Sequence, residues 1–184
     1  MNKETFINCC KDINIDITEE LYKKLYNYFE MLNEWNNKFN LTTILDEKDV
    51  FLLHFYDSLC LTKSIETNNK ISLLDFGTGA GFPGMVIAIV FNNIDVTLIE
   101  SNKKKCDFLE EIKNKLDIKN VKIINDRIEN YGIKNREKFD IVTCRAVTSI
   151  PIIIELSTST IKVGGYLVPL KTNCIEEVEK YKSN

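Results

Sequence analysis

The chain has 184 residues, of which 44% are hydrophobic and 28% are charged, enough apolar side chains for one domain with a sizeable core. Its formal net charge is −3 at pH 7 and its pI is near 5.4, which argues against a protein that binds nucleic acid through a bulk positive potential. That charge does not exclude an enzyme that approaches RNA through one local basic patch.

The six cysteines form no C-x-x-C pair and the chain holds a single histidine, so the spacing typical of zinc ligands is absent. The sequence has no apolar secretory signal core and no run of about 18 apolar residues that could span a membrane. We therefore expect reduced, mostly buried thiols in a monomeric cytoplasmic protein, with no metal and no membrane partner.

Residues 1–67 are expected to form a small helical region packed on the core. Asp16 and Glu19 have the spacing of a capping box, and apolar side chains then recur at helical intervals as far as Trp35. A second helix is predicted from Asp46 to about Leu61. Because Trp35 lies on the apolar stripe, we expect it to be a core residue rather than a platform for base stacking.

From residue 68 onward, short apolar runs alternate with helical segments. Strands are predicted at residues 71–76, 95–99, 121–124, 139–144 and 165–170. Helices are predicted at residues 83–91, 102–116, 151–161 and 175–181, with Ser101 as the N-cap of the second. This alternation predicts an α/β fold, a mostly parallel sheet with helices on both faces, whose cofactor-binding core is residues 68–184.

A glycine-rich loop from Asp75 to Gly84 follows the first predicted strand, where an open α/β sheet binds its ligands. Its glycines let a ligand approach the backbone closely, so Gly77 and Gly79 are candidate binding residues. The loop reads D-x-G-x-G-x-G from Asp75. It also contains G-x-G-x-x-G from Gly79, so NAD and a nicotinamide oxidoreductase remain an alternative, as does a tight turn without any ligand.

Two residues of the loop favour S-adenosylmethionine over NAD. Asp75 can hold a cationic amino group and would repel a pyrophosphate. Pro83 removes one backbone N–H from the start of the helix, where phosphates bind. Glu100 ends the second predicted strand and can accept hydrogen bonds from two ribose hydroxyls, but NAD would use it in the same way.

Four segments resemble the bacterial small-subunit ribosomal RNA guanine-N7 methyltransferases, also known as the glucose-inhibited division protein B family. Two are the glycine loop, residues 73–84, and the run C-R-A-V at residues 144–147. Residues 35–42 are similar to the family's W-N-x-x-x-N-L-T signature, and residues 54–59 are similar to its R-H-x-x-D-S-L segment. The resemblance covers nearly the whole chain in order, and it implies a Rossmann-like methyltransferase fold.

The resemblance also implies methyl transfer from S-adenosyl-L-methionine to N7 of a guanosine in 16S ribosomal RNA, as naked RNA or in the small ribosomal subunit. It implies cofactor contacts at Gly77, at Phe82, at Ile128 and Glu129 after the third strand, and at Arg145 after the fourth. No catalytic residue is assigned, because guanine N7 carries a free lone pair and needs no general base. We hypothesise that Arg145 spans the cofactor and substrate pockets.

Other methyl acceptors fit the sequence less well. The fourth strand is not followed by the N-P-P-Y run typical of amine-directed enzymes, and we expect Cys144 to be a buried thiol rather than the nucleophile of a cytosine-C5 enzyme. Seven lysines gather around one predicted helix, where either an RNA contact or an ordinary solvated face would explain them: Lys103, Lys104, Lys105, Lys113, Lys115, Lys119 and Lys122.

The chain departs from the family pattern at three places. Leu53 stands where the family usually has Arg, and Lys171-Thr172 stands where it has Lys-Gly. Methyltransferase sheets of this type normally end with two further strands, which we expect to be missing because the chain stops at Asn184. A cofactor-binding domain without catalysis is therefore an alternative function. Packing or hydrogen bonding is expected for His54, while Asp57 is expected to help order the loop above the cofactor.

Overall fold

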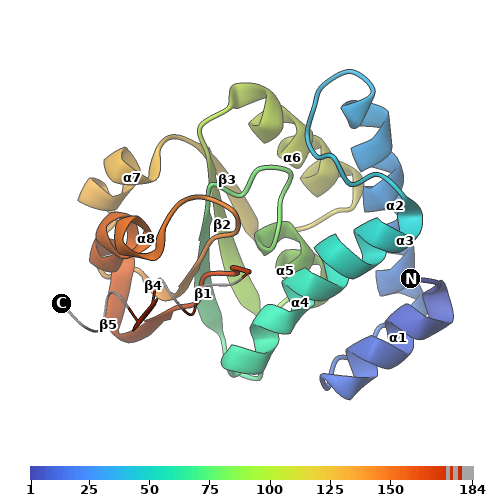
Figure 1. Ribbon diagram of the computed structural model, residues 1–184, viewed down its shortest axis with the longest axis horizontal. Coiled ribbons are helices and arrows are strands. Elements are labelled where there is room, and N and C mark those ends of the chain that lie inside the picture. The colour runs from blue at the N-terminus through green and yellow to red at the C-terminus, as the bar shows by residue number, and fades with distance from the viewer. Residues whose placement is uncertain (173–174, 176–177, 180–184) are drawn as a thin grey trace.

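In the computed structural model, which describes residues 1–172, 175 and 178–179, five strands form one sheet between two layers of helices (Figure 1). The strands lie in the order β3-β2-β1-β4-β5, and their four pairings are parallel. Their bounds are β1 Ile71–Phe76, β2 Ile94–Glu100, β3 Val121–Asn125, β4 Phe139–Thr143 and β5 Ile161–Leu167. The predicted α/β architecture with a parallel sheet is therefore confirmed.

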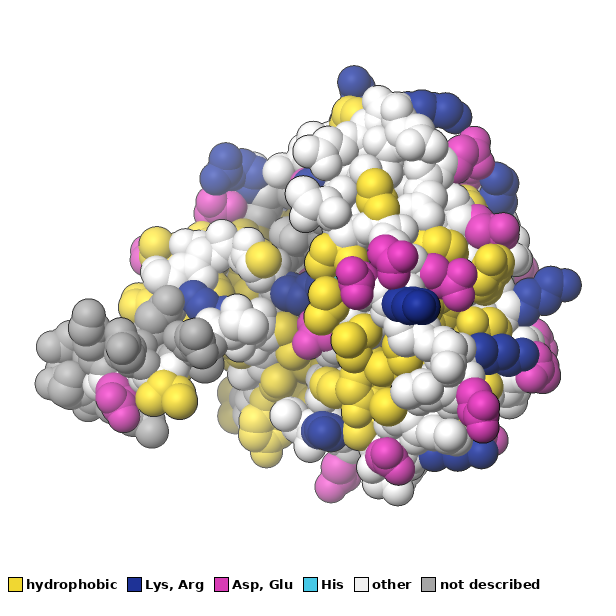
Figure 2. Space-filling model, turned by 45° about the vertical axis from the view of Figure 1, so that its right-hand side comes forward, with side chains coloured by type: hydrophobic (Ala, Val, Ile, Leu, Met, Phe, Trp, Pro, Cys, Tyr) yellow, Lys and Arg dark blue, Asp and Glu magenta, His cyan; other side chains and the backbone are white. Residues whose placement is uncertain are grey.

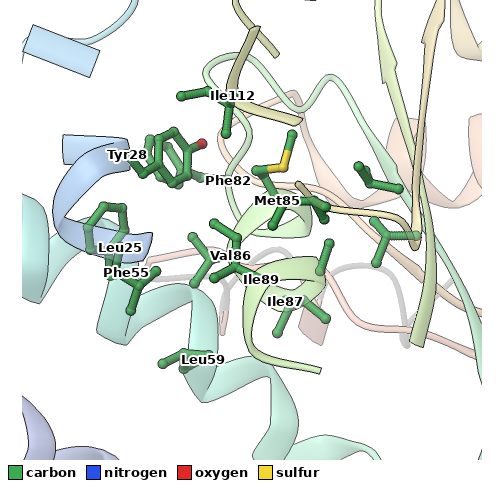
Figure 3. Close-up of a cluster of buried hydrophobic side chains, with 14 of the residues drawn as sticks. Leu25, Tyr28, Phe55, Leu59, Phe82, Met85, Val86, Ile87, Ile89 and Ile112 are labelled. Carbon is green, nitrogen blue, oxygen red and sulfur yellow. The ribbon is translucent and has the colours of Figure 1, made fainter. Parts of the chain in front are cut away.

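One face of the sheet is covered by helices from both parts of the chain. Helices α5 (Gly84–Val90) and α6 (Lys103–Lys115) follow β1 and β2, and α1 (Lys3–Asp12) and α2 (Glu19–Asn36) pack beyond them (Figure 1). Figure 3 shows Leu25 and Tyr28 of α2 directed toward α5. Both side chains are fully buried, and burying a leucine contributes about 2 kcal/mol. The N-terminal helices and the sheet thus share one hydrophobic cluster.

The opposite face carries a smaller layer. Helices α7 (Ile128–Lys134) and α8 (Ile150–Ser157), with the 3₁₀ turn η3 (Thr158–Thr160), cover it (Figure 1). A second hydrophobic cluster joins Phe76 and Val142 of the sheet to Ile153 of α8. Among the described residues, no helix combines the length and the apolar character needed to cross a membrane.

A continuous helical run links the two N-terminal helices to β1. It comprises α3 (Glu47–Asp49), a π-helix η1 (Val50–Tyr56), α4 (Asp57–Leu59) and a 3₁₀ turn η2 (Cys60–Ser64). As predicted, Asp46 begins it, because its side chain accepts hydrogen bonds from the N–H groups of Lys48 and Asp49. The π-helical turn was not predicted, and such turns often lie at functional sites.

Two predicted helix caps are wrong by one or two residues. Helix α2 is capped by Thr18, whose Oγ1 accepts from the N–H of Leu21 at 3.2 Å, and not by Asp16. Helix α6 is capped by Asn102 rather than Ser101. In both helices the capping side chain belongs to the residue directly before the first helical turn, where it reaches the free N–H groups.

The region after β4 differs most from the prediction. Helix α8 ends at Ser157 instead of residue 161, and β5 occupies residues 161–167 instead of 165–170. Gly164 has φ +82°, and the pairing with β4 shifts register there, so a regular apolar alternation does not mark the strand. No helix was predicted over the residues that form α7. The helix predicted at residues 175–181 lies mostly outside the described residues.

Candidate functional site

The glycine loop leaves β1 at the point where the sheet reverses its strand order, with β2 on one side and β4 on the other. Ligands bind at such switch points in open α/β sheets. Gly77 adopts φ +64°, and a Cβ added there would lie 2.8 Å from Cγ2 of Val147. Both the left-handed backbone and the close neighbour require glycine at this position.

Asp75 lies beneath the loop and is fully buried. Its Oδ2 accepts hydrogen bonds from Thr78 Oγ1 at 2.6 Å and from the N–H of Gly84 at 2.8 Å, while Oδ1 has no hydrogen-bond partner in the described structure. Burial raises the pKa of this carboxyl to about 7, against the opposite effect of the two hydrogen bonds. Asp75 therefore stabilises the loop through Oδ2, while its Oδ1 can still accept a hydrogen bond.

Glu100 is also mostly buried, with 7% of its surface exposed. Its Oε2 accepts a hydrogen bond from the N–H of Gly79 at 2.9 Å, and its Oε1 accepts one from the N–H of Asn102 at 2.8 Å. The carboxylate thus ties the end of β2 to the glycine loop and to the start of α6. Each oxygen retains a lone pair for a further donor.

A cavity of about 350 Å³ opens at the carboxyl ends of β1, β2 and β3, within the size range of small-molecule sites. Its apolar wall is formed by Phe76, Ile99, Ile128, Val147, Ile152 and Leu156. Its polar lining is formed by Ser101, Asp126, Arg127, Glu129 and Thr148. An apolar slot with polar groups at one edge suits a flat heteroaromatic ring.

Three of the predicted site residues, Gly77, Ile128 and Glu129, line this cavity. The other predicted site residues do not line this cavity: Asp75, Gly79, Phe82, Glu100 and Arg145. Sequence reasoning missed Asp126, although it follows β3 directly as Glu100 closes β2. It also missed Ile152 and Leu156, because they come from α8, a helix that only the tertiary fold brings to this edge.

Phe82 faces the N-terminal helices. Its ring is 5% exposed and stacks against the rings of Tyr28 and His54, with centroid distances of 5.5 and 4.4 Å. Figure 3 shows Tyr28 and Phe82 side by side. The Tyr28 hydroxyl donates a hydrogen bond to the carbonyl of Ala80 inside the glycine loop. Residues 1–67 therefore support the loop directly.

Arg145 binds the same N-terminal region. Its Nη1 donates to the Leu53 carbonyl and to Asp57 Oδ2, both at 3.0 Å, and its Nη2 lies 3.0 Å from His54 Nδ1. The guanidinium also lies over the Phe82 ring, 5.1 Å from its centroid. The motifs at residues 54–59 and 144–147, far apart in the sequence, thus meet beside the glycine loop.

The remaining candidate residues, Cys144, Trp35 and Lys171, are buried or make contacts that stabilise the fold. Cys144 is 1% exposed, and burial raises the pKa of its thiol to about 12, so it carries little thiolate. Trp35 packs against Phe108 and donates its indole N–H to Glu111 at 3.0 Å. Lys171 donates to the carbonyl of Thr148 at 3.0 Å. No group of three potential metal ligands occurs among the described residues.

Four of the seven lysines around α6 form ion pairs, three of them with acids on the same helix and Lys119 with Asp117. Lys103, Lys113 and Lys115 form ion pairs with Asp107, Glu110 and Glu111. On the face shown in Figure 2, positive and negative side chains are likewise interspersed. These pairings favour a solvated helix face over a dedicated basic patch.

Comparison with known proteins decides the family. The sequence model of the family described as rRNA small subunit methyltransferase G matches residues 21–184. The chain belongs to this family. The rRNA small subunit methyltransferase G of Staphylococcus carnosus (strain TM300) is 37% identical over 96% of this chain and 75% of its own length. That of Oceanobacillus iheyensis is 39% identical over 97% of this chain and 76% of its own length.

Solved structures place the fold of this rRNA small subunit methyltransferase G family member among methyltransferases. A protein-L-isoaspartate O-methyltransferase superposes over 91% of this chain and 55% of its own, with a TM-score of 0.60 and 14% identity. A precorrin-6y C5,15-methyltransferase from Geobacter metallireducens GS-15 covers 80% of this chain and 75% of its own, with a TM-score of 0.56 and 16% identity. The predicted family and the predicted fold class are both confirmed.

Proposed function

We propose that this chain transfers a methyl group from S-adenosyl-L-methionine to N7 of a guanosine in 16S ribosomal RNA. The observation that carries the proposal is the cavity at the switch point of the sheet, bordered by the glycine loop and the buried Glu100, in a chain whose relatives are named rRNA small subunit methyltransferase G.

The residues around the cavity fit S-adenosylmethionine. Glu100 offers free lone pairs to two ribose hydroxyls, and Ile99 and Ile128 offer apolar faces to an adenine. The carboxylate of Asp126, at the polar edge, can accept from an adenine amino group. The unpartnered Oδ1 of Asp75 is an acceptor for the cationic amino group. NAD fits this site less well, because its negatively charged pyrophosphate would be repelled by these carboxylates.

Methyl transfer to guanine N7 requires no acid or base catalysis by a side chain. The bound cofactor supplies an electrophilic methyl group on a sulfonium, and guanine N7 attacks it with a lone pair that carries no proton. The chain's own residues must hold both partners in line at about 3 Å and exclude water. We propose that Arg145, held beside the loop, positions the cofactor or an RNA phosphate.

We further propose that the chain acts as a monomer in the cytoplasm, on the small ribosomal subunit or its RNA. The overall acidic charge favours recognition of a folded particle over binding of any RNA through bulk charge.

Two measurements on the purified chain test the proposal against its alternatives. Transfer of labelled methyl from S-adenosylmethionine to small subunits supports methylation. Binding of S-adenosylhomocysteine without transfer would instead support a domain that lacks catalysis. Calorimetry with NAD decides the third possibility, because tight binding of NAD and none of S-adenosylhomocysteine would overturn the methyltransferase assignment.

A further inference from the structure

Five side chains link the N-terminal region to the loop after β4. His54, in the π-helical turn, lies 3.0 Å from Thr42 Oγ1 through Nε2 and 3.0 Å from Arg145 Nη2 through Nδ1. Arg145 continues to Asp57 at 3.0 Å. Thr42 is itself held by Asn36, whose Oδ1 accepts from the N–H of Thr42 at 3.0 Å. Three separate sequence motifs therefore form one hydrogen-bonded chain.

The direction of these hydrogen bonds follows from chemistry. A guanidinium has donors only, so Nδ1 of His54 must accept from Arg145. Nδ1 also lies 3.2 Å from the Leu53 carbonyl, a longer contact than the 3.0 Å that joins it to the Arg145 donor. A proton on Nδ1 would place two donors face to face. The proton of the neutral ring therefore sits on Nε2 and is donated to Thr42.

The consequence for the site runs through the backbone after Arg145. Ala146 is held at φ +54°, and Val147 packs against Gly77 and lines the cavity together with Thr148. A side chain anchored at Arg145 therefore fixes the segment that forms one wall of the cavity. The arginine side chain is 17% exposed, so its position depends on these partners rather than on solvent.

We infer that His54 is a positioning residue for methyl transfer, which as neutral Nε2–H imidazole holds Arg145, and through it the 145–148 segment, in the geometry that the reaction needs. This inference rests on the proposed function for its effect on turnover. The hydrogen-bond arrangement itself can be tested without any activity.

Isosteric substitutions separate the two ring nitrogens. His54→Asn places an amide oxygen near Nδ1 and keeps an acceptor for Arg145. His54→Gln reaches toward Nε2 and keeps only the contact with Thr42. We expect the Gln variant to lose roughly 10- to 100-fold in kcat/KM, the size of a lost hydrogen bond to a charged group, while the Asn variant recovers most of that loss. Equal defects in both variants would overturn the inference.

The ring state is directly observable, because His54 is the only histidine in the chain. In protein prepared without a histidine tag, ¹⁵N NMR at neutral pH should show one imidazole, protonated at Nε2 and unprotonated at Nδ1. Protonation at Nδ1, or a charged ring, would overturn the inference whatever the enzyme does. Lack of methyl transfer by the wild-type chain, with the Nε2–H ring observed, would instead count against the proposed function alone.

Discussion

The carboxylate of Glu100 accepts a hydrogen bond from the backbone N–H of Gly79 at 2.9 Å. One acid thus closes the gap between β2 and the glycine loop, and it does so at the place where a ribose is expected to bind. Loop geometry and cofactor affinity are therefore coupled through a single side chain.

Replacing Glu100 by Gln should weaken binding of S-adenosylhomocysteine roughly 10- to 100-fold, the cost of losing charged hydrogen bonds. The amide offers one acceptor oxygen, and its NH₂ group would face a backbone N–H. Isothermal titration calorimetry measures the change. Glu110→Gln, half-buried on the same side of the sheet but not lining the cavity, is the matched control and should bind as the wild type does. An unchanged Kd in Glu100→Gln would remove Glu100 from the site.

Gly77→Ala should destabilise the fold by about 1–3 kcal/mol and impair cofactor binding, because its backbone is left-handed and Val147 leaves no room for a Cβ. Adding Val147→Ala removes the steric part while the backbone strain remains. Urea denaturation of the two single variants and the double variant gives the coupling energy. A double variant whose loss equals the sum of the single losses would show that the predicted contact is absent.

Asp75 should make cofactor binding depend on pH. Its pKa is raised to about 7, so the carboxyl is neutral below pH 7 and cannot pair with a cationic amino group until it ionises. The affinity should rise with pH by up to about tenfold per unit below pH 7 and then level off. In Asp75→Asn this slope should vanish. Calorimetry at several pH values measures it, and a flat profile in the wild type would show that Asp75 does not bind the amino group in its ionised form.

His54 should contribute stability that falls as the solution is acidified. Burial, followed by the nearby Arg145, lowers its pKa from 6.5 to about 4, while the Leu53 carbonyl and then Asp57 act in the opposite direction. Between pH 6.5 and pH 4, His54 is therefore protonated in the unfolded chain but stays neutral in the folded chain. The free energy of unfolding drops by about 3 kcal/mol over that window.

The contribution of His54 is isolated by subtraction from His54→Asn, because the buried carboxyl of Asp75 titrates in the same range with the opposite sign. Its raised pKa stabilises the folded chain as the pH falls from 7 toward 3.8. Urea titrations of both proteins at pH 7 and pH 4.5 give the difference. Parallel pH profiles for the two proteins would show that His54 titrates normally.

The sequence predicted the parts of the site that depend on local chemistry. The strand-loop-helix around Gly77 and the strand-end acid Glu100 are recognisable because glycine and carboxylate have few substitutes there. The second strand could be placed correctly for the same reason, since an apolar run that ends in an acid marks it clearly.

What the sequence could not reveal depends on contacts across the fold. The wall from α8 is invisible in the residues around Ile152, which read as an ordinary apolar helix. The pairing of His54 with Arg145 joins residues 91 positions apart, and the direction of each hydrogen bond follows only from their geometry. The shifted β5 reflects the left-handed Gly164, whose conformation interrupts the alternation that predicts strands.

Mass mapping of 16S ribosomal RNA tests the central claim most directly. Small subunits that lack the modification are incubated with the chain and labelled S-adenosylmethionine, and the RNA is then digested and analysed by mass spectrometry. We predict one additional methyl group on a single guanosine, with strand cleavage at that residue after borohydride and aniline treatment, as N7 methylation requires. A methyl group on a cytosine carbon or an exocyclic amine, or no methyl group at all, would contradict the assignment.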